Sequence, residues 1–253
     1  MSPLILITND DGIDAKGIQV LGRLMSQIGD VVVFAPDGPR SGQSNALTVH
    51  TPLRFKKKDE MPHLVSYSCN GTPTDCVKLA LHEVLKERKP DLLVSGINHG
   101  SNAAINVIYS GTMGAVFEGC ESGIPSIGFS LLDHDSNADF SFFEPYILRI
   151  VQQVLEKGLP SRVCLNVNAP LGEIAGMQVV RQCNGYWTEE FEKRSDPRGS
   201  GHYFWLTGRF HNLEPEAEDT DEWVLSQGYI SIVPTTIDMT SYRELEDMKT
   251  WKW

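Results

Sequence analysis

Two adjacent carboxylates, Asp10 and Asp11, follow the first apolar run of the chain and lie within the sequence T-N-D-D-G. Side-by-side carboxylates at the end of a buried strand repel each other, and burial makes each charge costlier. A hard divalent cation between them would remove this repulsion, because carboxylate oxygens are its preferred ligands. Asp and Gly are also common turn residues, so these residues taken alone are compatible with an ordinary turn.

Three further polar loops carry hydroxyl and amide groups that could bind an ion or a phosphate. In chain order, these candidates are Ser41, Asn45, Asn98, Asn102, Ser110, Gly111 and Thr112. The last three begin a predicted helix, where free backbone N–H groups favour a phosphate. With the two carboxylates they supply oxygen ligands and neutral donors, which suits Mg²⁺ or Mn²⁺ and does not suit zinc. His99 lies in one of these loops, but a single loop histidine is more often a surface residue, and we leave it out.

The sequence lacks the signatures of several other sites. Residues 96–100 do not match the dinucleotide fingerprint G-x-G-x-x-G, and neither the P-loop pattern nor the zinc pattern H-E-x-x-H occurs. The nucleophile elbow G-x-S-x-G is also missing. A glycosyl- or acyltransferase of Rossmann type is therefore disfavoured, since it would need a second Rossmann half or a nucleophile motif.

Alternating strand and helix patterns predict the fold that carries these loops. A strand at 4–7, an amphipathic helix at 16–28 and a strand at 31–35 form a βαβ unit, which implies parallel strands. Later patterns predict strands at 47–55, 64–69, 91–95, 125–130 and 163–167, and helices at 77–85, after 112 and at 142–155. The predicted fold class is α/β, a Rossmann-like, doubly wound and mostly parallel sheet. Ligands of such sheets bind beyond the carboxyl ends of the strands, where most of the polar loops lie.

The last third of the chain has a different pattern. Strand-like segments are separated by long polar loops, and no helix is predicted. These segments lie at 177–182, 202–206 and 229–233. We therefore divide the chain into a core at 1–175, which carries the site, and a β-rich C-terminal extension at 176–253. The extension is not an independent domain, and we expect it to serve as an oligomerisation arm.

Composition and charge narrow the range of partners. The 253 residues carry a formal net charge of −11, whereas proteins that track polynucleotides need clustered Lys and Arg. We interpret the basic cluster at 54–58 as a solvated strand edge, the acidic run at 214–222 as an exposed loop, and the cysteines as reduced core residues. The chain starts directly in a strand and has no apolar run of about 20 residues, the length that crosses a bilayer. We expect a cytoplasmic protein without a membrane or nucleic-acid-polymer partner.

Seven sequence blocks follow one another along nearly the whole chain. They are T-N-D-D-G at 8–12, P-D-G-P-R-S-G-Q-S-N-A-L-T at 36–48, G-T-P-T-D-C-V at 71–77, S-G-I-N-H-G-S-N at 95–102, Y-S-G-T-M-G-A-V-F-E-G at 109–119, D-P-R-G at 196–199 and G-Y-I-S-I-V-P at 228–234. In this order they resemble the SurE (survival protein E) family of metal-dependent nucleotidases. The chain departs from the family pattern at 203–205 and 214–222, which leaves substrate preference and assembly open.

The resemblance implies a role for each matching residue. Asp10, Asp11, Ser41 and Asn98 would hold one divalent metal ion per subunit, Mg²⁺ or Mn²⁺. The phosphate would be bound by Asn45, Asn102, Ser110 and Thr112, to which we add Gly111 of the same helix start. The resemblance also implies hydrolysis of nucleoside 5′- and 3′-monophosphates, with short-chain polyphosphate cut by some members. It further implies a homodimer or homotetramer whose subunits exchange the C-terminal arm.

Two mechanisms and one function without catalysis are compatible with these residues. With Asp10 and Asp11 as the catalytic carboxylates, we favour metal-assisted attack of water over attack by one Asp to form an aspartyl-phosphate, because the metal uses both carboxylates. The alternative from another class is a nucleotide-binding sensor that does not hydrolyse its ligand. The segment 196–199 is interpreted as a turn, and its Arg198 is not assigned to the site.

Overall fold

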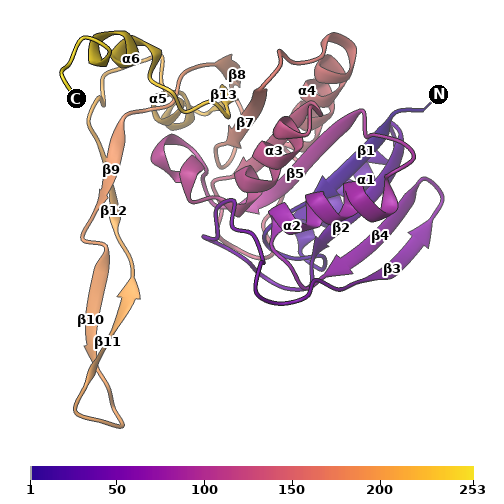
Figure 1. Cartoon of the computed structure of the whole chain (residues 1–253), viewed down its shortest axis with the longest axis horizontal. Helices are drawn as coiled ribbons and strands as arrows, with labels where there is room; N and C mark the ends of the chain where they lie inside the picture. The colour runs from indigo at the N-terminus through magenta and orange to yellow at the C-terminus, as the bar shows by residue number, and fades with distance from the viewer. Residues whose placement is uncertain (1) are drawn as a thin grey trace.

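The computed structural model describes residues 2–253 and is built on a nine-stranded sheet with helices on both faces (Figure 1). Across the sheet, the strands are β3 (Phe55–Met61), β4 (Leu64–Cys69), β2 (Asp30–Pro36), β1 (Leu4–Thr8), β5 (Leu92–His99), β6 (Ser126–Leu131), β7 (Val163–Ala169), β13 (Tyr229–Thr236) and β8 (Gly176–Val179). β3 runs antiparallel to β4, and β13 runs antiparallel to β7. The other neighbouring pairs are parallel, which confirms the predicted doubly wound, mostly parallel α/β fold.

The two faces of the sheet bury alternate residues of β1. Ile5 and Ile7 lie in the hydrophobic cluster formed with α1 (Lys16–Met25) and α4 (Glu144–Lys157). Leu4 and Leu6 lie in the second cluster, with α2 (Pro73–Leu79) and α3 (Gly111–Glu121). Successive side chains of a strand point to opposite faces, so a central strand covered on both sides must be apolar throughout. All residues of β1 are accordingly buried.

The strand order reverses beside β1. The chain passes from β1 to its neighbour β2 on one side, and later returns to place β5 on the other side. Ligands of open α/β sheets bind at such a reversal, beyond the carboxyl ends of the strands. The T-N-D-D-G turn follows β1 at this point, and the loop that contains Asn102 follows β5.

Two predictions about local structure are wrong. The segment 47–54 contains no strand, and the hairpin strand is β3, whose residues are all exposed. β3 has no buried face, so apolar periodicity does not reveal it. In the segment 47–54 the Thr48 N–H bonds to a side chain, Asp75 Oδ1 at 3.1 Å, and not to a neighbouring strand. The absence of helices after residue 176 is also wrong, because α5 (Asp221–Ser226) and α6 (Tyr242–Met248) occur there. Both helices are shorter than the window needed to show a 3.6-residue period.

A long two-stranded ribbon leaves the sheet and extends away from it (Figure 1). We call residues 185–212 the arm. In it β9 (Gly185–Thr188) pairs with β12 (Arg209–Asn212), and β10 (Phe191–Ser195) pairs with β11 (His202–Leu206). The predicted division of the chain after residue 175 stays a prediction. Two strands that follow residue 175, β8 and β13, belong to the main sheet together with strands of the predicted core.

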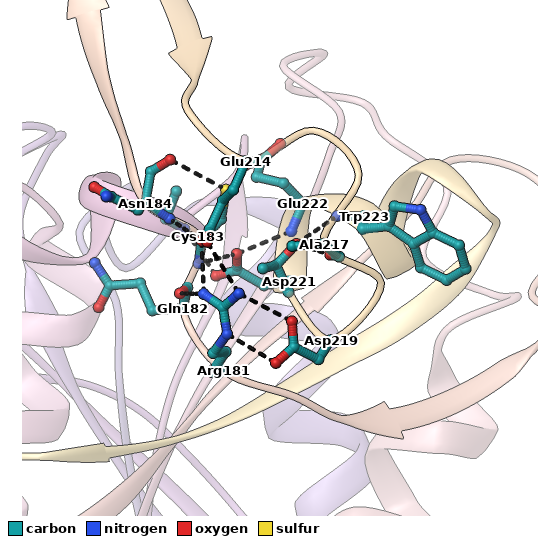
Figure 2. Close-up of polar contacts among 12 residues, drawn as sticks. Arg181, Gln182, Cys183, Asn184, Glu214, Ala217, Asp219, Asp221, Glu222 and Trp223 are labelled. Carbon is teal, nitrogen blue, oxygen red and sulfur yellow. Dashed lines mark hydrogen bonds and ion pairs between the residues drawn. The ribbon is translucent and has the colours of Figure 1, made fainter.

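The base of the arm is held by a cluster of polar contacts (Figure 2). The Arg181 guanidinium binds the Glu214 carboxylate at 2.6 and 3.0 Å and the Asp219 carboxylate at 2.9 Å twice. Asp221 is fully buried and accepts hydrogen bonds from the backbone N–H groups of Cys183 and Ala104, both at 2.8 Å. Asp221 therefore connects the start of the arm to the loop that follows β5.

Other predictions from composition can also be compared with the structure. The five cysteines are buried and free, as predicted. The basic cluster at 54–58 falls largely on β3 at the exposed edge of the sheet. The prediction of an exposed loop at 214–222 is wrong for its last part, because Thr220 and Asp221 are fully buried and α5 begins at Asp221. Within residues 2–253, none of the helices has both the length and the apolar character required to cross a membrane.

Candidate functional site

The T-N-D-D-G turn is fixed by its own buried asparagine. The Asn9 side chain accepts a hydrogen bond from the Gly12 N–H at 3.2 Å and donates one to the Gly12 carbonyl at 3.0 Å. Gly12 has a φ of +101°, which L side chains rarely adopt. The Asp10 carbonyl also accepts from the Arg40 N–H at 2.7 Å, which ties this turn to the loop of Ser41. Two of the predicted polar loops are thus joined through backbone contacts.

Asp10 is buried against the start of α3. Only 3% of the residue is exposed, and its Oδ1 accepts a hydrogen bond from the Thr112 hydroxyl at 2.6 Å. A Cβ atom at Gly111 would lie 2.9 Å from Asp10 Oδ2, so the close approach of helix and carboxylate needs glycine there. Burial raises the pKa of Asp10 to about 6, the Thr112 hydrogen bond opposes this rise, and the Asp11 charge adds to it. Such a carboxylate gains most from a nearby cation.

Asp11 is oriented by a histidine that we did not predict to be in the site. His99 Nδ1 lies 3.0 Å from Asp11 Oδ2, and the imidazole packs edge-on against Phe140 with ring centroids 5.4 Å apart. His99 Nε2 is buried and has no hydrogen-bond partner within residues 2–253. The position of His99 at the end of β5, next to β1, was the available signal.

A cavity of about 280 Å³ opens at this edge of the sheet. Five predicted residues line it, namely Asp10, Ser41, Asn98, Asn102 and Ser110. The lining also includes residues that the sequence did not single out: Gly42, His99, Ser101, Asn106, Tyr109, His134 and Trp187. Tyr109 directly precedes Ser110 in the chain, whereas Trp187 lies on the arm and carried no sequence signal.

Four other predicted residues do not line this cavity. Asp11 is bonded to His99, which lines the cavity. Gly111 and Thr112 contact Asp10, which also lines it. Thr112 is fully buried, with its hydroxyl directed to Asp10 and not to the cavity. Asn45 is exposed and lines a neighbouring cavity of about 280 Å³ that also contains Lys78. Their proposed roles as ligands remain predictions.

Asn102 belongs to a buried hydrogen-bond network. Its side-chain amide donates to the Ser130 hydroxyl at 2.8 Å, and its backbone N–H donates to Asn168 Oδ1 at 2.8 Å. The Asn166 amide donates to the Asn102 carbonyl at 2.8 Å, and the Asn168 amide donates to Asn166 Oδ1 at 3.0 Å. Buried amides bonded in this way hold a loop rigidly, because breaking any bond leaves an unpaired polar group. The network therefore fixes the far wall of the cavity.

The donor atoms at the cavity fit a hard divalent cation. The Asn98 amide nitrogen donates to the Gly100 carbonyl at 2.9 Å, which leaves its oxygen on the other side of the amide. Residues 2–253 contain no group of three or more His, Cys, Asp or Glu side chains arranged to hold a metal. The lining supplies the Asp10 carboxylate, the Ser41 hydroxyl and the Asn98 amide oxygen, with the Asp11 carboxylate next to His99. These oxygen atoms suit Mg²⁺, which keeps several water ligands and uses one or two carboxylates. Cavities of about 600 and 670 Å³ elsewhere lack these polar loops.

Comparison with known proteins identifies the family. The family described as "Survival protein SurE" matches residues 5–189. The chain is 53% identical to a protein named 5′-nucleotidase SurE from Phocaeicola vulgatus, over 98% of this chain and 96% of the relative. It is also 53% identical to the protein of the same name from Flavobacterium psychrophilum, over 98% and 97%. The crystal structure of the SurE protein from Aquifex aeolicus superposes with a TM-score of 0.84 at 37% identity and covers 98% of both chains. The chain belongs to the survival protein SurE family.

Proposed function

We propose that this chain is a divalent-metal-dependent phosphatase that removes phosphate from nucleoside 5′- and 3′-monophosphates. The observation that carries the proposal is the position of Asp10 and Asp11 at the carboxyl end of β1. Asp10 packs against Gly111 at the start of α3, and Asp11 is bonded to His99 of β5. The name of the relatives, 5′-nucleotidase SurE, supports the same substrate class. Short-chain polyphosphate is a further substrate to be tested.

In this proposal Asp10, Asp11, Ser41 and Asn98 hold one Mg²⁺ or Mn²⁺ ion per subunit. When bound, the ion would neutralise phosphate oxygens and lower the pKa of a coordinated water. Thr112 and His99 each bind one oxygen of a carboxylate, Asp10 and Asp11 respectively, so both carboxylates are oriented before the substrate enters. Oriented ligands need no reorganisation during the reaction, and this is where much of the rate enhancement of enzymes arises.

The start of α3 provides the second half of the phosphate site. The Ser110 hydroxyl caps the helix by accepting from the Met113 N–H at 3.0 Å. Free N–H groups of the first turn remain, and helix N-termini attract phosphate oxygens. Asn102 lines the same cavity as Ser110 and is held by Ser130 and Asn168. A phosphate between these groups would sit beside Asp10.

We propose direct attack of water on phosphorus, with Asp10 or Asp11 orienting the water. We favour water as the nucleophile because Thr112 and His99 each occupy one carboxylate oxygen of Asp10 and Asp11, and the proposed metal ion would use the other. A phosphorylated aspartate trapped by rapid quench would overturn this mechanism. Direct attack of water transfers the phosphoryl group in one step, without a covalent intermediate.

The test is phosphate release from a panel of nucleoside 5′- and 3′-monophosphates and short polyphosphate, with Mg²⁺, with Mn²⁺ or with a chelator. We expect turnover that the chelator abolishes and that Asp11→Asn reduces by about 10²–10³-fold, the loss typical of one electrostatic group. Asp14→Asn is the matched control, because its side chain is 77% exposed and bound to Lys58.

A nucleotide-binding sensor gives a different result in the same experiment. It would bind nucleotide, as measured by calorimetry, and release no phosphate under any metal condition. It would also tolerate Asp11→Asn. This combination of results would replace the phosphatase proposal.

We also propose that the protein is a homodimer or homotetramer assembled through the arm. The supporting observation is the exposure of large apolar side chains on β10 and β11. These are Phe191, Tyr203, Phe204, Trp205 and Leu206, which are between 40% and 73% exposed. Contiguous exposed apolar side chains mark interaction surfaces.

A further inference from the structure

The arm contributes one aromatic side chain to the candidate site. Trp187 of β9 lines the cavity together with Asn106 and Tyr109, although the rest of the arm extends away from the sheet. We propose that Trp187 is the specificity-determining residue of the site and that the nucleobase stacks on its indole ring. This inference rests on the proposed function, because it names the part of the substrate that the polar groups of the cavity do not bind.

The indole ring is held in place from three sides. Its Nε1–H donates to Asn106 Oδ1 at 2.8 Å, and Phe210 of β12 packs against it in a T-shaped contact with ring centroids 6.1 Å apart. A Cβ atom at Gly208 would lie only 2.9 Å from Trp187 Cε3, so the ribbon backbone also packs on the ring. A ring fixed before binding loses little conformational entropy when a flat ligand stacks on it.

Trp187 differs in this respect from other aromatic residues of the arm. Trp205 of β11 is 61% exposed and Phe204 is 57% exposed, whereas Trp187 is partly buried and bonded to the loop between β5 and α3. A tryptophan needed only to cover a protein surface would not have to line a polar cavity. Its position therefore indicates contact with a ligand.

The lining of the cavity combines two kinds of chemistry. Asp10, Asn98 and Ser110 supply charge and hydrogen bonds, which suit a metal-bound phosphate. Tyr109 and Trp187 supply aromatic surface, which suits a heterocycle. A ligand that uses both kinds of group carries a phosphate and a flat ring, as a nucleoside monophosphate does.

Stacking also predicts how selective the site is. Every base has a π-face, so an aromatic platform tolerates all bases and favours the larger purines. Asn106 uses its oxygen for the indole N–H, and its amide nitrogen remains as a donor for the base edge or the ribose. We therefore expect broad base tolerance with a preference for purines.

A purely structural role for Trp187 is the competing explanation. In that case the indole would only hold Asn106 and the loop around it, and its removal would disturb phosphate and nucleotide binding alike. The two explanations differ in what happens to a substrate without a base.

The experiment compares adenosine 5′-monophosphate with ribose 5-phosphate in the wild type, Trp187→Ala and Trp187→Phe. Both substrates present a phosphate on a ribose, and only one has a base. We expect Trp187→Ala to lower kcat/KM for the nucleotide by about 5- to 100-fold, mainly through KM, which is the range for loss of one base–aromatic stack. Ribose 5-phosphate should change less than about 2-fold, and Trp187→Phe should retain most of the nucleotide activity, because it keeps an aromatic face. Trp251→Ala, which changes a 52% exposed tryptophan outside the arm, is the control and should change the rate with neither substrate.

Each outcome decides a different question. Equal losses on both substrates, or no loss on the nucleotide, would overturn the stacking role. If the wild type releases phosphate from neither substrate, the proposed function fails, and calorimetric affinities of the same variants for the nucleotide then decide the inference. Lower affinity in Trp187→Ala, with retained affinity in Trp187→Phe, would support stacking in a binding protein, whereas unchanged affinity would overturn it.

Discussion

The carboxyl edge of the sheet buries polar side chains, whereas the arm exposes apolar ones. At the edge, Asp10, Asn102 and Ser130 are buried, and each is bonded to another part of the same chain. On β10 and β11 every residue is exposed, and Leu206 is 73% exposed. A buried polar group must be paired where it lies, whereas an exposed apolar group gains only when a partner covers it. The polar groups named at the edge are thus paired within one chain, although His99 Nε2 is not, whereas the apolar side chains of the arm stay uncovered.

The two regions meet at Asp221 and Trp187. Asp221 bonds the base of the arm to the loop after β5, and Trp187 bonds β9 to Asn106. These two contacts bring the arm, which is otherwise separate from the sheet, to the wall of the candidate site. Substitutions at the edge of the sheet, at the base of the arm and on the arm itself therefore test the two regions separately.

Replacing Asp10 by Asn should have the largest effect on the edge. We expect phosphate release to fall by about 10²–10³-fold, since one of the two carboxylates proposed to hold the cation and orient the water is lost. The metal-free protein should be no less stable than the wild type, because the amide keeps an acceptor for Thr112 and removes a buried charge beside Asp11. Thermal unfolding with and without Mg²⁺ checks this, and the rise in Tm caused by Mg²⁺ should disappear.

The control is Asp37→Asn, which changes a half-exposed carboxylate paired with Arg40. It should leave both the activity and the metal-dependent Tm unchanged. An Asp10→Asn variant that retains activity would contradict the assignment of this edge as the reaction site.

The contact made by Asp221 predicts the next largest effect. Asp221→Ala leaves the buried N–H groups of Ala104 and Cys183 without an acceptor, and each such loss costs about 1–3 kcal/mol. For the two groups together we expect the free energy of unfolding to fall by about 2–6 kcal/mol. Denaturant unfolding measures this change. Asp219→Ala in the same cluster removes a side chain that is 70% exposed, and should cost less than about 1 kcal/mol. Equal effects of the two variants would show that the arm is held by Arg181 and not by Asp221.

The strands of the sheet were predictable because they are apolar on both faces, as β1, β2 and β5 are. Asp10 and Asp11 were predictable because two adjacent carboxylates at the end of a buried strand repel each other unless a cation lies near them. The contacts of His99 and Trp187 were not, since their partners Asp11 and Asn106 lie 88 and 81 residues away in the chain. Only His99 had an indirect signal, its place in a polar loop after a predicted strand. No local pattern encodes a contact between such distant residues. β3 was misplaced for another reason, namely that an edge strand without a buried face has no hydrophobic period.

The pH dependence of stability provides a smaller effect at the base of the arm. Burial, followed by the charge of Asp221, raises the pKa of Glu222 from 4.5 to about 7. A carboxyl group whose pKa is higher in the folded state stabilises the fold fully below pH 4.5, and this contribution is lost as the pH rises through 7. Glu222→Gln should therefore exceed the wild type in stability by about 1–2 kcal/mol at pH 8, and the difference should vanish near pH 4.

Urea unfolding at several pH values measures this difference. Glu216→Gln is the control, because Glu216 is exposed in the neighbouring loop. A difference between Glu222→Gln and the wild type that is the same at pH 4 and pH 8 would show that Glu222 does not titrate in this range. The contribution of Glu222 to the free energy of unfolding would then not depend on pH between 4 and 8.

The smallest effect on the stability of the subunit is expected on the arm itself. Phe191 and Leu206 face each other across β10 and β11, and are 67% and 73% exposed. Exposed side chains contribute little to folding, so replacing both by Ser should change the free energy of unfolding of the subunit by less than about 1 kcal/mol. The same change should lower the molar mass measured by sedimentation velocity, because in the proposed assembly a second subunit would cover these exposed apolar side chains. Leu171→Ser, an equally exposed apolar change on the core at 56% exposure, should leave the mass unchanged. A double variant that keeps the wild-type mass would show that the arm is not the assembly surface, and the contrast between the two regions would then be one of exposure alone.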